Sequence, residues 1–194
     1  MGFSASNFAI DRVFWSARHI PNLISVIRML LIVPIVIALW RHELPTTLSL
    51  FAVAAVSDAA DGYLAKRFGW QSELGGVLDP IADKLLLATV FVTLSVLKLV
   101  PLWLMAAVVV RDVIIVLGAA GYRYFIGPLA AHPSLISKIN TLCQAAFILA
   151  VVGRAEFSAP SAWVTLWLGA LVFATVMVSG IDYVLVYGRR AAAA

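Results

Sequence analysis

The sequence consists mainly of apolar runs about 20 residues long, separated by short breaks that contain proline, glycine or charged residues. A run of about 20 apolar residues is as long as a helix that crosses the hydrocarbon core of a bilayer. Only α-helices and closed β-barrels can satisfy their backbone hydrogen bonds in lipid, and these runs are too long and continuous for barrel strands. The chain is 63% hydrophobic, whereas a soluble domain is roughly half apolar, so we predict an all-α integral membrane protein.

The apolar runs predict about six transmembrane helices. The expected spans cover residues 21–40, 45–68, 75–97, 101–125, 134–152 and 160–187. Residues 6–19 mix aromatic and charged side chains, which is typical of an amphipathic helix that lies on the membrane surface. The predicted organisation is therefore an N-terminal interfacial helix in residues 1–20 and a single membrane domain in residues 21–190.

Lysine and arginine are distributed unequally between the two sides of the predicted bundle. With six spans, both termini lie on one side, which collects Arg12, Arg18, Lys66, Arg67, Arg123, Lys138, Arg189 and Arg190. The other side collects only Arg41, Lys98 and Arg154. The positive-inside rule places the termini at the cytoplasmic or matrix face of a bacterial or mitochondrial inner membrane. The basic residues are scattered, so they predict an anionic lipid surface as partner and no nucleic acid.

Four aspartates, Asp58, Asp61, Asp79 and Asp83, lie within the predicted second and third spans. Each charged side chain at the centre of a bilayer costs roughly 2.5–3.5 kcal/mol on insertion scales, so such residues indicate function. The first two are three residues apart and the last two are four apart, so each pair shares one face of a helix. If the two faces meet, they form a cage of oxygen ligands, which suits hard divalent cations such as Mg²⁺, Mn²⁺ or Ca²⁺.

Small residues and a cation accompany these acids. Gly62 follows Asp61, Ala65 lies one turn beyond it, and Gly75 lies one turn before Asp79. Residues with little or no side chain allow a bulky ligand to approach the helix backbone. Together with the adjacent Lys66, they predict a bound phosphate or nucleotide diphosphate.

The whole pattern, D-x2-D-G-x2-A-[R/K]-x8-G-x3-D-x3-D, resembles the signature of the CDP-alcohol phosphotransferase family. It occupies eight fixed positions within 26 residues: Asp58, Asp61, Gly62, Ala65, Lys66, Gly75, Asp79 and Asp83. The one departure from the family pattern is Lys66, where the family usually has arginine. Lysine lacks the planar fork with which arginine binds a phosphate through two hydrogen bonds.

The resemblance implies transfer of a phosphatidyl group from CDP-diacylglycerol to an alcohol, with release of CMP. It implies two Mg²⁺ or Mn²⁺ ions held by Asp58, Asp61, Asp79 and Asp83, with Asp83 also acting as the catalytic general base. It further implies that CDP is bound by Asp58, Gly62, Ala65, Lys66 and Gly75. A homodimer is compatible with the sequence, although no motif requires one.

Charged residues in the other spans are candidates for binding the acceptor alcohol. They are Arg28 in the first span, expected to face the bundle beside the acids, Arg111 and Arg123 in the fourth, and Lys138 in the fifth. Asp112 is expected to hold Arg111 or another base. Lys84, next to Asp83, is expected to pair with a phosphate or a carboxylate.

Residues 110–114 and 134–144 resemble the eukaryotic-type cardiolipin synthases within this family. Asp112 and Asn140 stand where phosphatidylglycerophosphate synthases usually have glutamate and a second lysine. One cation fewer implies an acceptor with one negative charge, so the expected reaction converts phosphatidylglycerol to cardiolipin. Transfer to glycerol 3-phosphate is the alternative. A divalent-cation transporter is a remote third hypothesis, since no second copy of the aspartate pattern is present.

Overall fold

The computed structural model describes the backbone of residues 20–68, 75–125 and 135–192, and side chains within residues 23–57, 81–124 and 135–185. These segments form six helices: α2 (Ile20–Trp40), α3 (Leu44–Phe68), α4 (Gly75–Val96), α5 (Leu102–Phe125), α6 (Leu135–Phe157) and α7 (Ala162–Ala192). They contain no strand, which confirms the all-α prediction for this part of the chain. The predicted interfacial helix lies outside the described residues.

The helix bounds follow the apolar runs closely. The first four predicted spans agree with α2 to α5 within one residue at each end. Helix α6 continues to Phe157, past the predicted end at residue 152, because Arg154 and Glu156 end the apolar run without ending the helix. A side chain at Gly153 would place its Cβ 3.2 Å from the Ala159 carbonyl oxygen, so this glycine allows the following turn to fold back closely.

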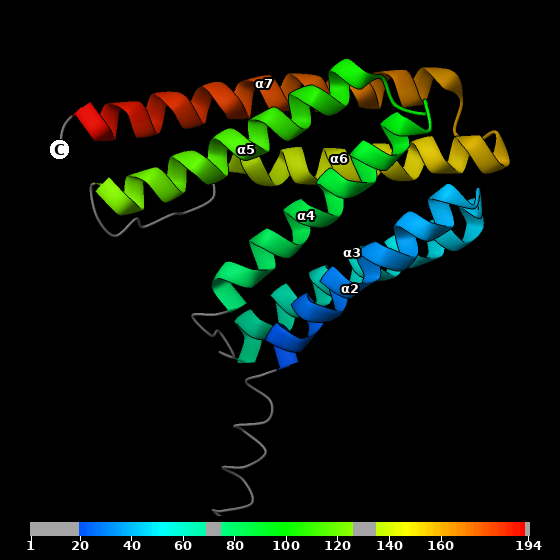
Figure 1. Ribbon diagram of the computed structural model, residues 1–194, viewed down its shortest axis with the longest axis horizontal. Helices are drawn as coiled ribbons and strands as arrows, with labels where there is room; N and C mark the ends of the chain where they lie inside the picture. Colours follow the sequence, from blue (N-terminus) through cyan, green and yellow to red (C-terminus); the bar gives the residue numbers. More distant parts are fainter. Residues whose placement is uncertain (1–19, 69–74, 126–134, 193–194) are drawn as a thin grey trace, which may run out of the picture.

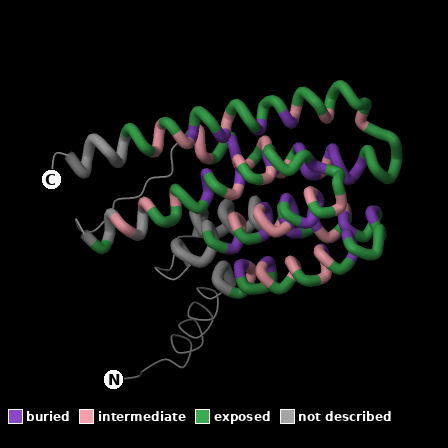
Figure 2. Tube along the Cα trace, turned by 45° about the horizontal axis from the view of Figure 1, so that its top comes forward, coloured by how far each residue is buried: buried purple, intermediate pink, exposed green. Residues whose placement is uncertain are grey.

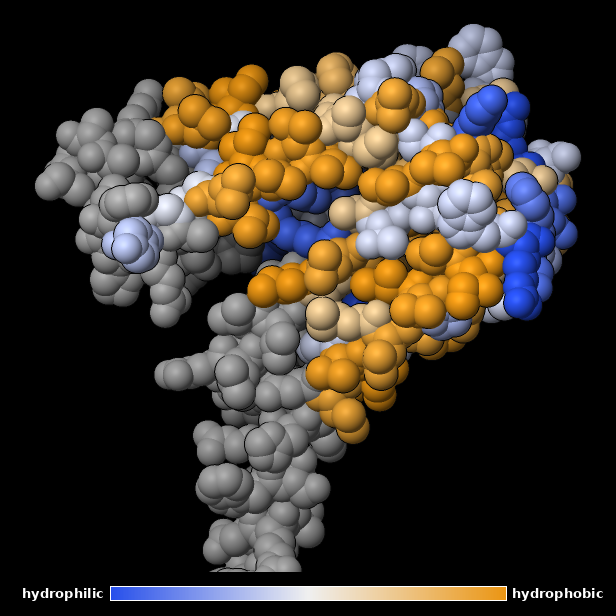
Figure 3. All heavy atoms as spheres, viewed as in Figure 1, coloured by the Kyte–Doolittle hydropathy of each residue, from blue (hydrophilic) through white to orange (hydrophobic). Residues whose placement is uncertain are grey.

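Three of the helices among the described residues are long and apolar enough to cross a membrane. These segments are Leu23–Trp40, Leu135–Phe157 and Ala162–Leu185, and a shorter apolar stretch covers Leu44–Ser57. Large apolar side chains are exposed on the outside of the bundle, for example Leu30 and Leu142, and they cover much of the surface in Figure 3. Such a surface is suited to lipid, which indicates a membrane protein. The finer count of six spans stays a prediction.

The helices form two groups, with α4 between them (Figure 1). Helix α2 packs against α3 and α4, and α7 packs against α5 and α6. Contacts of α3 with α6 and of α4 with α5 join the groups. The groups converge at the end formed by the α2–α3, α4–α5 and α6–α7 connections and diverge toward the other end (Figure 1). The acidic segments of α3 and α4 belong to the diverging end.

The core lies where these helices face one another. In Figure 2 the buried positions line the inner sides of the helices, and the outer sides are exposed. The rings of Phe91 on α4 and Phe147 on α6 stack with their centroids 5.9 Å apart. Other fully buried side chains are Ile35, Leu39, Leu94, Val108, Val172 and Val176. This apolar packing, mostly toward the converging end, fixes how the polar residues of the bundle lie.

Candidate functional site

The acid pattern lies on the C-terminal part of α3 and the first turns of α4. Both segments are helical, so Asp58 shares a face with Asp61, and Asp79 with Asp83, as predicted. Only six residues join Phe68 to Gly75, which limits the distance between these helix ends to roughly 25 Å. Of the four aspartates, only the Asp83 side chain is among those described.

The residues of the pattern fit a divalent cation by their chemistry. Carboxylate oxygens are the ligands that Mg²⁺ and Mn²⁺ prefer. Among the described side chains no group of three metal-binding residues occurs, since three of the four aspartates are not among them. For the same reason, the predicted CDP contacts of Gly62, Ala65, Lys66 and Gly75 stay predictions.

A buried cation contacts the predicted catalytic base. Arg28 on α2 is only 1% exposed, and its guanidinium forms an ion pair with the carboxylate of Asp83 on α4. A charge in an apolar interior requires a partner of opposite sign, and this pair supplies one. Arg28 therefore faces the bundle and lies beside one of the four aspartates, Asp83. Its predicted contact with the acceptor stays a prediction.

A second polar centre connects four helices around Arg111. The Arg111 guanidinium donates to Asp112 Oδ1 at 2.6 Å and to Ser137 Oγ on α6 at 3.1 Å. It also donates to the hydroxyl of Ser179 on α7. The ammonium of Lys84 on α4 lies 3.5 Å from the same Asp112 oxygen. We call these five residues the Arg111 cluster.

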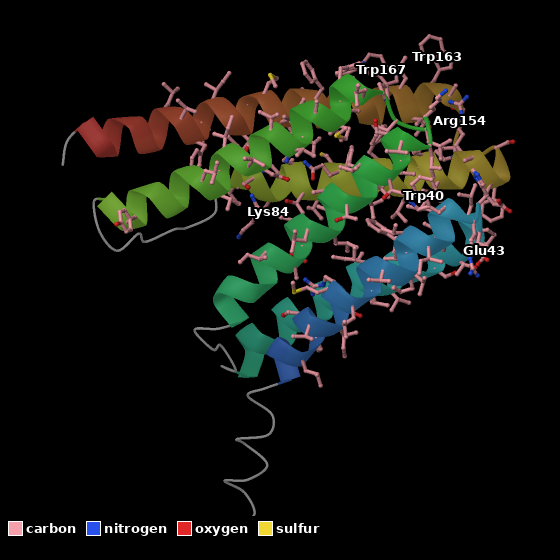
Figure 4. The ribbon with its side chains drawn as sticks, viewed as in Figure 1. Trp40, Glu43, Lys84, Arg154, Trp163 and Trp167 are labelled. Carbon is pink, nitrogen blue, oxygen red and sulfur yellow. The ribbon has the colours of Figure 1, made fainter. Side chains whose placement is uncertain are left out.

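The Arg111 cluster is closed on one side and open on the other. Arg111 and Asp112 are buried, at 5% and 8% exposure, whereas the Lys84 side chain is 29% exposed. In Figure 4, Lys84 extends from α4 on the side toward α5 and α6. Figure 3, in the same view, shows hydrophilic atoms recessed between two apolar surfaces at this place. A charged ligand would therefore reach the cluster past Lys84.

Two amides continue the polar surface along α6, deeper in the bundle. Asn140, one turn after Ser137, is fully buried and hydrogen-bonded to the Thr175 hydroxyl on α7 at 2.9 Å. Gln144 lies one turn further and is also buried. The nitrogen of each amide has no hydrogen-bond partner among the described residues. Buried polar groups usually have partners, so these two donors indicate a place for ligand or water oxygens.

The two other residues predicted to bind the acceptor are Lys138 and Arg123. Lys138 is exposed, and its ammonium group makes no hydrogen bond or ion pair within the described part of the chain. Its neighbour Ser137 contacts Arg111, and adjacent residues of a helix point about 100° apart. The described contacts therefore do not bring Lys138 and Arg111 together. The side chain of Arg123 lies outside those described.

Sequence reasoning missed the two contributions from α7. Thr175 and Ser179 are four residues apart, so they share one face of an otherwise apolar helix. That spacing was the available signal, and it identifies the face of α7 that meets Arg111 and Asn140.

Comparison with known proteins places this arrangement in a family. The model of the CDP-alcohol phosphatidyltransferase family matches residues 18–178. A probable cardiolipin synthase (CMP-forming) of Drosophila melanogaster is 36% identical over 145 residues, which are 66% of this chain and 45% of the relative. A probable phosphatidylglycerophosphate synthase of Mycobacterium tuberculosis is 27% identical over 173 residues, 86% of this chain and 80% of the relative.

A third relative extends the match over most of the chain. A chloroplastic CDP-diacylglycerol–glycerol-3-phosphate 3-phosphatidyltransferase of Oryza sativa is 32% identical over 191 residues, 87% of this chain and 57% of the relative. The chain spans about half the length of the cardiolipin synthases that it matches. Since the family model covers most of the sequence, including all eight positions of the acid pattern, the chain belongs to the CDP-alcohol phosphatidyltransferase family.

Proposed function

We propose that this protein is a membrane enzyme that transfers a phosphatidyl group from CDP-diacylglycerol to phosphatidylglycerol, giving cardiolipin and CMP. The observation that carries the choice of acceptor is the charge of the Arg111 cluster. Arg111 and Lys84 each contribute one positive charge and Asp112 one negative charge, so the cluster has a net charge of +1. This complements the single negative charge of a phosphodiester.

The predicted base supports the chemistry of the transfer. The acceptor hydroxyl oxygen forms a bond to the phosphorus that carries the diacylglycerol, and its proton passes to the Asp83 carboxylate. The bond from that phosphorus to the bridging oxygen breaks, and CMP leaves with the electron pair. Arg28 holds the Asp83 carboxylate from the side of α2, which orients it for this proton transfer.

Two divalent ions complete the proposed site. Asp58, Asp61 and Asp79 would hold them, with Asp83 as a further ligand. When bound, such ions supply charge stabilisation to the pyrophosphate and to the leaving phosphate. Gly62, Ala65, Lys66 and Gly75 would contact CDP.

Glycerol 3-phosphate is the second candidate acceptor. The relatives from Mycobacterium tuberculosis and Oryza sativa favour it, since they match more of this chain than the Drosophila protein does. Against it stands the neutral amide of Asn140, because a phosphate monoester carries nearly two negative charges and would need a further cation. The three relatives described above are named as enzymes, which favours an enzyme over the transporter hypothesis.

The proposed setting follows from the distribution of charge. Phosphatidylglycerol reaches the site from within the bilayer of a bacterial or mitochondrial inner membrane. The diverging end of the bundle, with the acid pattern, faces the cytoplasm or matrix. We also propose that the protein forms a homodimer.

A comparison of acceptors tests the proposal. Purified protein with Mg²⁺ or Mn²⁺ and labelled CDP-diacylglycerol is given phosphatidylglycerol or glycerol 3-phosphate, and the lipid products are separated by mass. We expect cardiolipin and CMP from the first acceptor. Asp83→Asn, which keeps an oxygen ligand but loses the base, should slow transfer by about 10²–10⁴-fold. Product from glycerol 3-phosphate alone would contradict the assignment of phosphatidylglycerol as acceptor. Absence of CMP with both acceptors would contradict the proposal that the protein catalyses this transfer.

A further inference from the structure

A groove runs between α5, α6 and α7 at the converging end of the bundle, away from the acid pattern. Its volume is about 460 Å³, and its lining is apolar except for one hydroxyl and one charged residue. The lining residues that matter here are Trp103, Phe147, Val151, Arg154, Leu166 and Gly169. None of them belongs to the proposed active site.

The groove is long, and its inner wall is closely packed. Along α7 it extends from Ala162 to Ala170, about 12 Å at a rise of 1.5 Å per residue. Phe147 and Val151 on α6 are buried and form part of the wall. At Gly169 an added Cβ would lie 3.2 Å from the Phe147 ring, so α7 and α6 approach closely there. An elongated apolar ligand fits these dimensions.

The mouth of the groove carries a cation at the level of an aromatic belt. Arg154 lies in the last turn of α6 and is exposed, and its guanidinium makes no ion pair or hydrogen bond within the described segments. Trp103 is 59% exposed and Trp163 is 70% exposed, and Figure 4 shows Arg154, Trp163 and Trp167 at this end of the bundle. Exposed tryptophans of this kind mark the membrane–water interface. The mouth therefore lies at the depth of lipid head groups, and the groove leads toward the acyl chains.

We propose that this groove binds one anionic phospholipid. An acyl chain lies between Trp103 and Leu166, and the phosphodiester pairs with Arg154. A zwitterionic lipid fills the apolar part equally well, but it has no net negative charge and therefore gains little from Arg154. The site therefore prefers a lipid with net negative charge, and it acts independently of the proposed transfer reaction.

Lipid binding to the full chain in detergent, measured by native mass spectrometry, tests the proposal. The probes are phosphatidylserine, which is anionic and is not the proposed acceptor, and phosphatidylcholine with the same acyl chains. We expect Arg154→Gln to weaken phosphatidylserine binding about two- to fivefold, the range of an exposed ion pair, and to leave phosphatidylcholine binding unchanged. Arg41→Gln is the matched control, since it removes an exposed charge at the same end but outside the groove.

A second variant tests the groove itself. Ala170 is exposed and lines the groove, so Ala170→Phe fills it without disturbing the core. We expect this change to remove one bound lipid of either type. Equal phosphatidylserine affinity of Arg154→Gln and wild type would overturn the role of Arg154. Unchanged lipid binding by Ala170→Phe, or a change of oligomeric mass in place of a lost lipid, would overturn lipid as the occupant. Neither result depends on transfer activity, so the proposed function can fail separately.

Discussion

Replacing Asp112 should destabilise the helix bundle, because its carboxylate is the counter-ion of the buried Arg111. Its Oδ1 accepts from Arg111 at 2.6 Å and lies 3.5 Å from the Lys84 ammonium. Asp112→Asn keeps the size of the side chain but removes its charge. The Arg111 guanidinium, only 5% exposed, then retains two serine hydroxyls and no counter-ion. Removing one partner of a buried ion pair typically costs about 3–5 kcal/mol.

The expected loss is large enough to measure by thermal unfolding. For a chain of this length, 1 kcal/mol corresponds to about 2–4 °C in Tm, so Asp112→Asn should lower Tm by about 6–20 °C. Tryptophan fluorescence in detergent reports the transition, and size-exclusion chromatography checks that the variant is monodisperse before heating. The control is Lys84→Met, which removes the longer and partly exposed contact and should cost about 0–1 kcal/mol.

The comparison between the two variants decides the outcome. If Asp112→Asn melts within about 2 °C of wild type, or together with Lys84→Met, then the Arg111–Asp112 pair does not stabilise the fold. The four-helix connection through Arg111 would then be a consequence of helix packing and would contribute little to it.

Three further changes have distinct expected results. Gly118→Ala would place a Cβ 2.8 Å from both a ring carbon and the hydroxyl of Tyr183, which donates to the Ile115 carbonyl, so Tm should fall. The fall should be smaller in a Tyr183→Phe background, which keeps the ring contact but lacks the hydroxyl; equal losses would show that the Tyr183 hydroxyl plays no part in the loss. Asn140→Leu should leave Tm unchanged or raise it, because the buried amide nitrogen of Asn140 lacks a partner among the described residues. The same substitution should lower kcat/KM for phosphatidylglycerol, and an unchanged kcat/KM would exclude Asn140 from the acceptor site. Chelation by EDTA should abolish CMP release, and Mg²⁺ or Mn²⁺ should restore it; full turnover in EDTA would exclude the two-metal proposal.

Helix positions were predictable from the sequence because they depend on local properties. Apolar runs fixed the length of α2 to α5, and prolines near residues 21, 45 and 101 marked where helices begin. The aspartate pattern was equally local: its three- and four-residue spacings share helix faces wherever the helices lie. The same pattern was enough to identify the family.

The partners of the charged residues depended on tertiary structure. Helices that are apolar almost all round carry no stripe that shows which face is buried, so the sequence left Arg28, Lys84 and Asp112 with several candidate partners. Packing of α2 on α4 brings Arg28 to Asp83, and packing of α4 on α5 brings Lys84 to Asp112. The spacing of Thr175 and Ser179 marked a polar face on α7, but not that this face meets Arg111. The groove beside Arg154 was unpredictable, because it arises from how α7 is rotated against α5 and α6. Sequence thus determined the helices and the chemistry they carry, and long-range packing decided which groups meet.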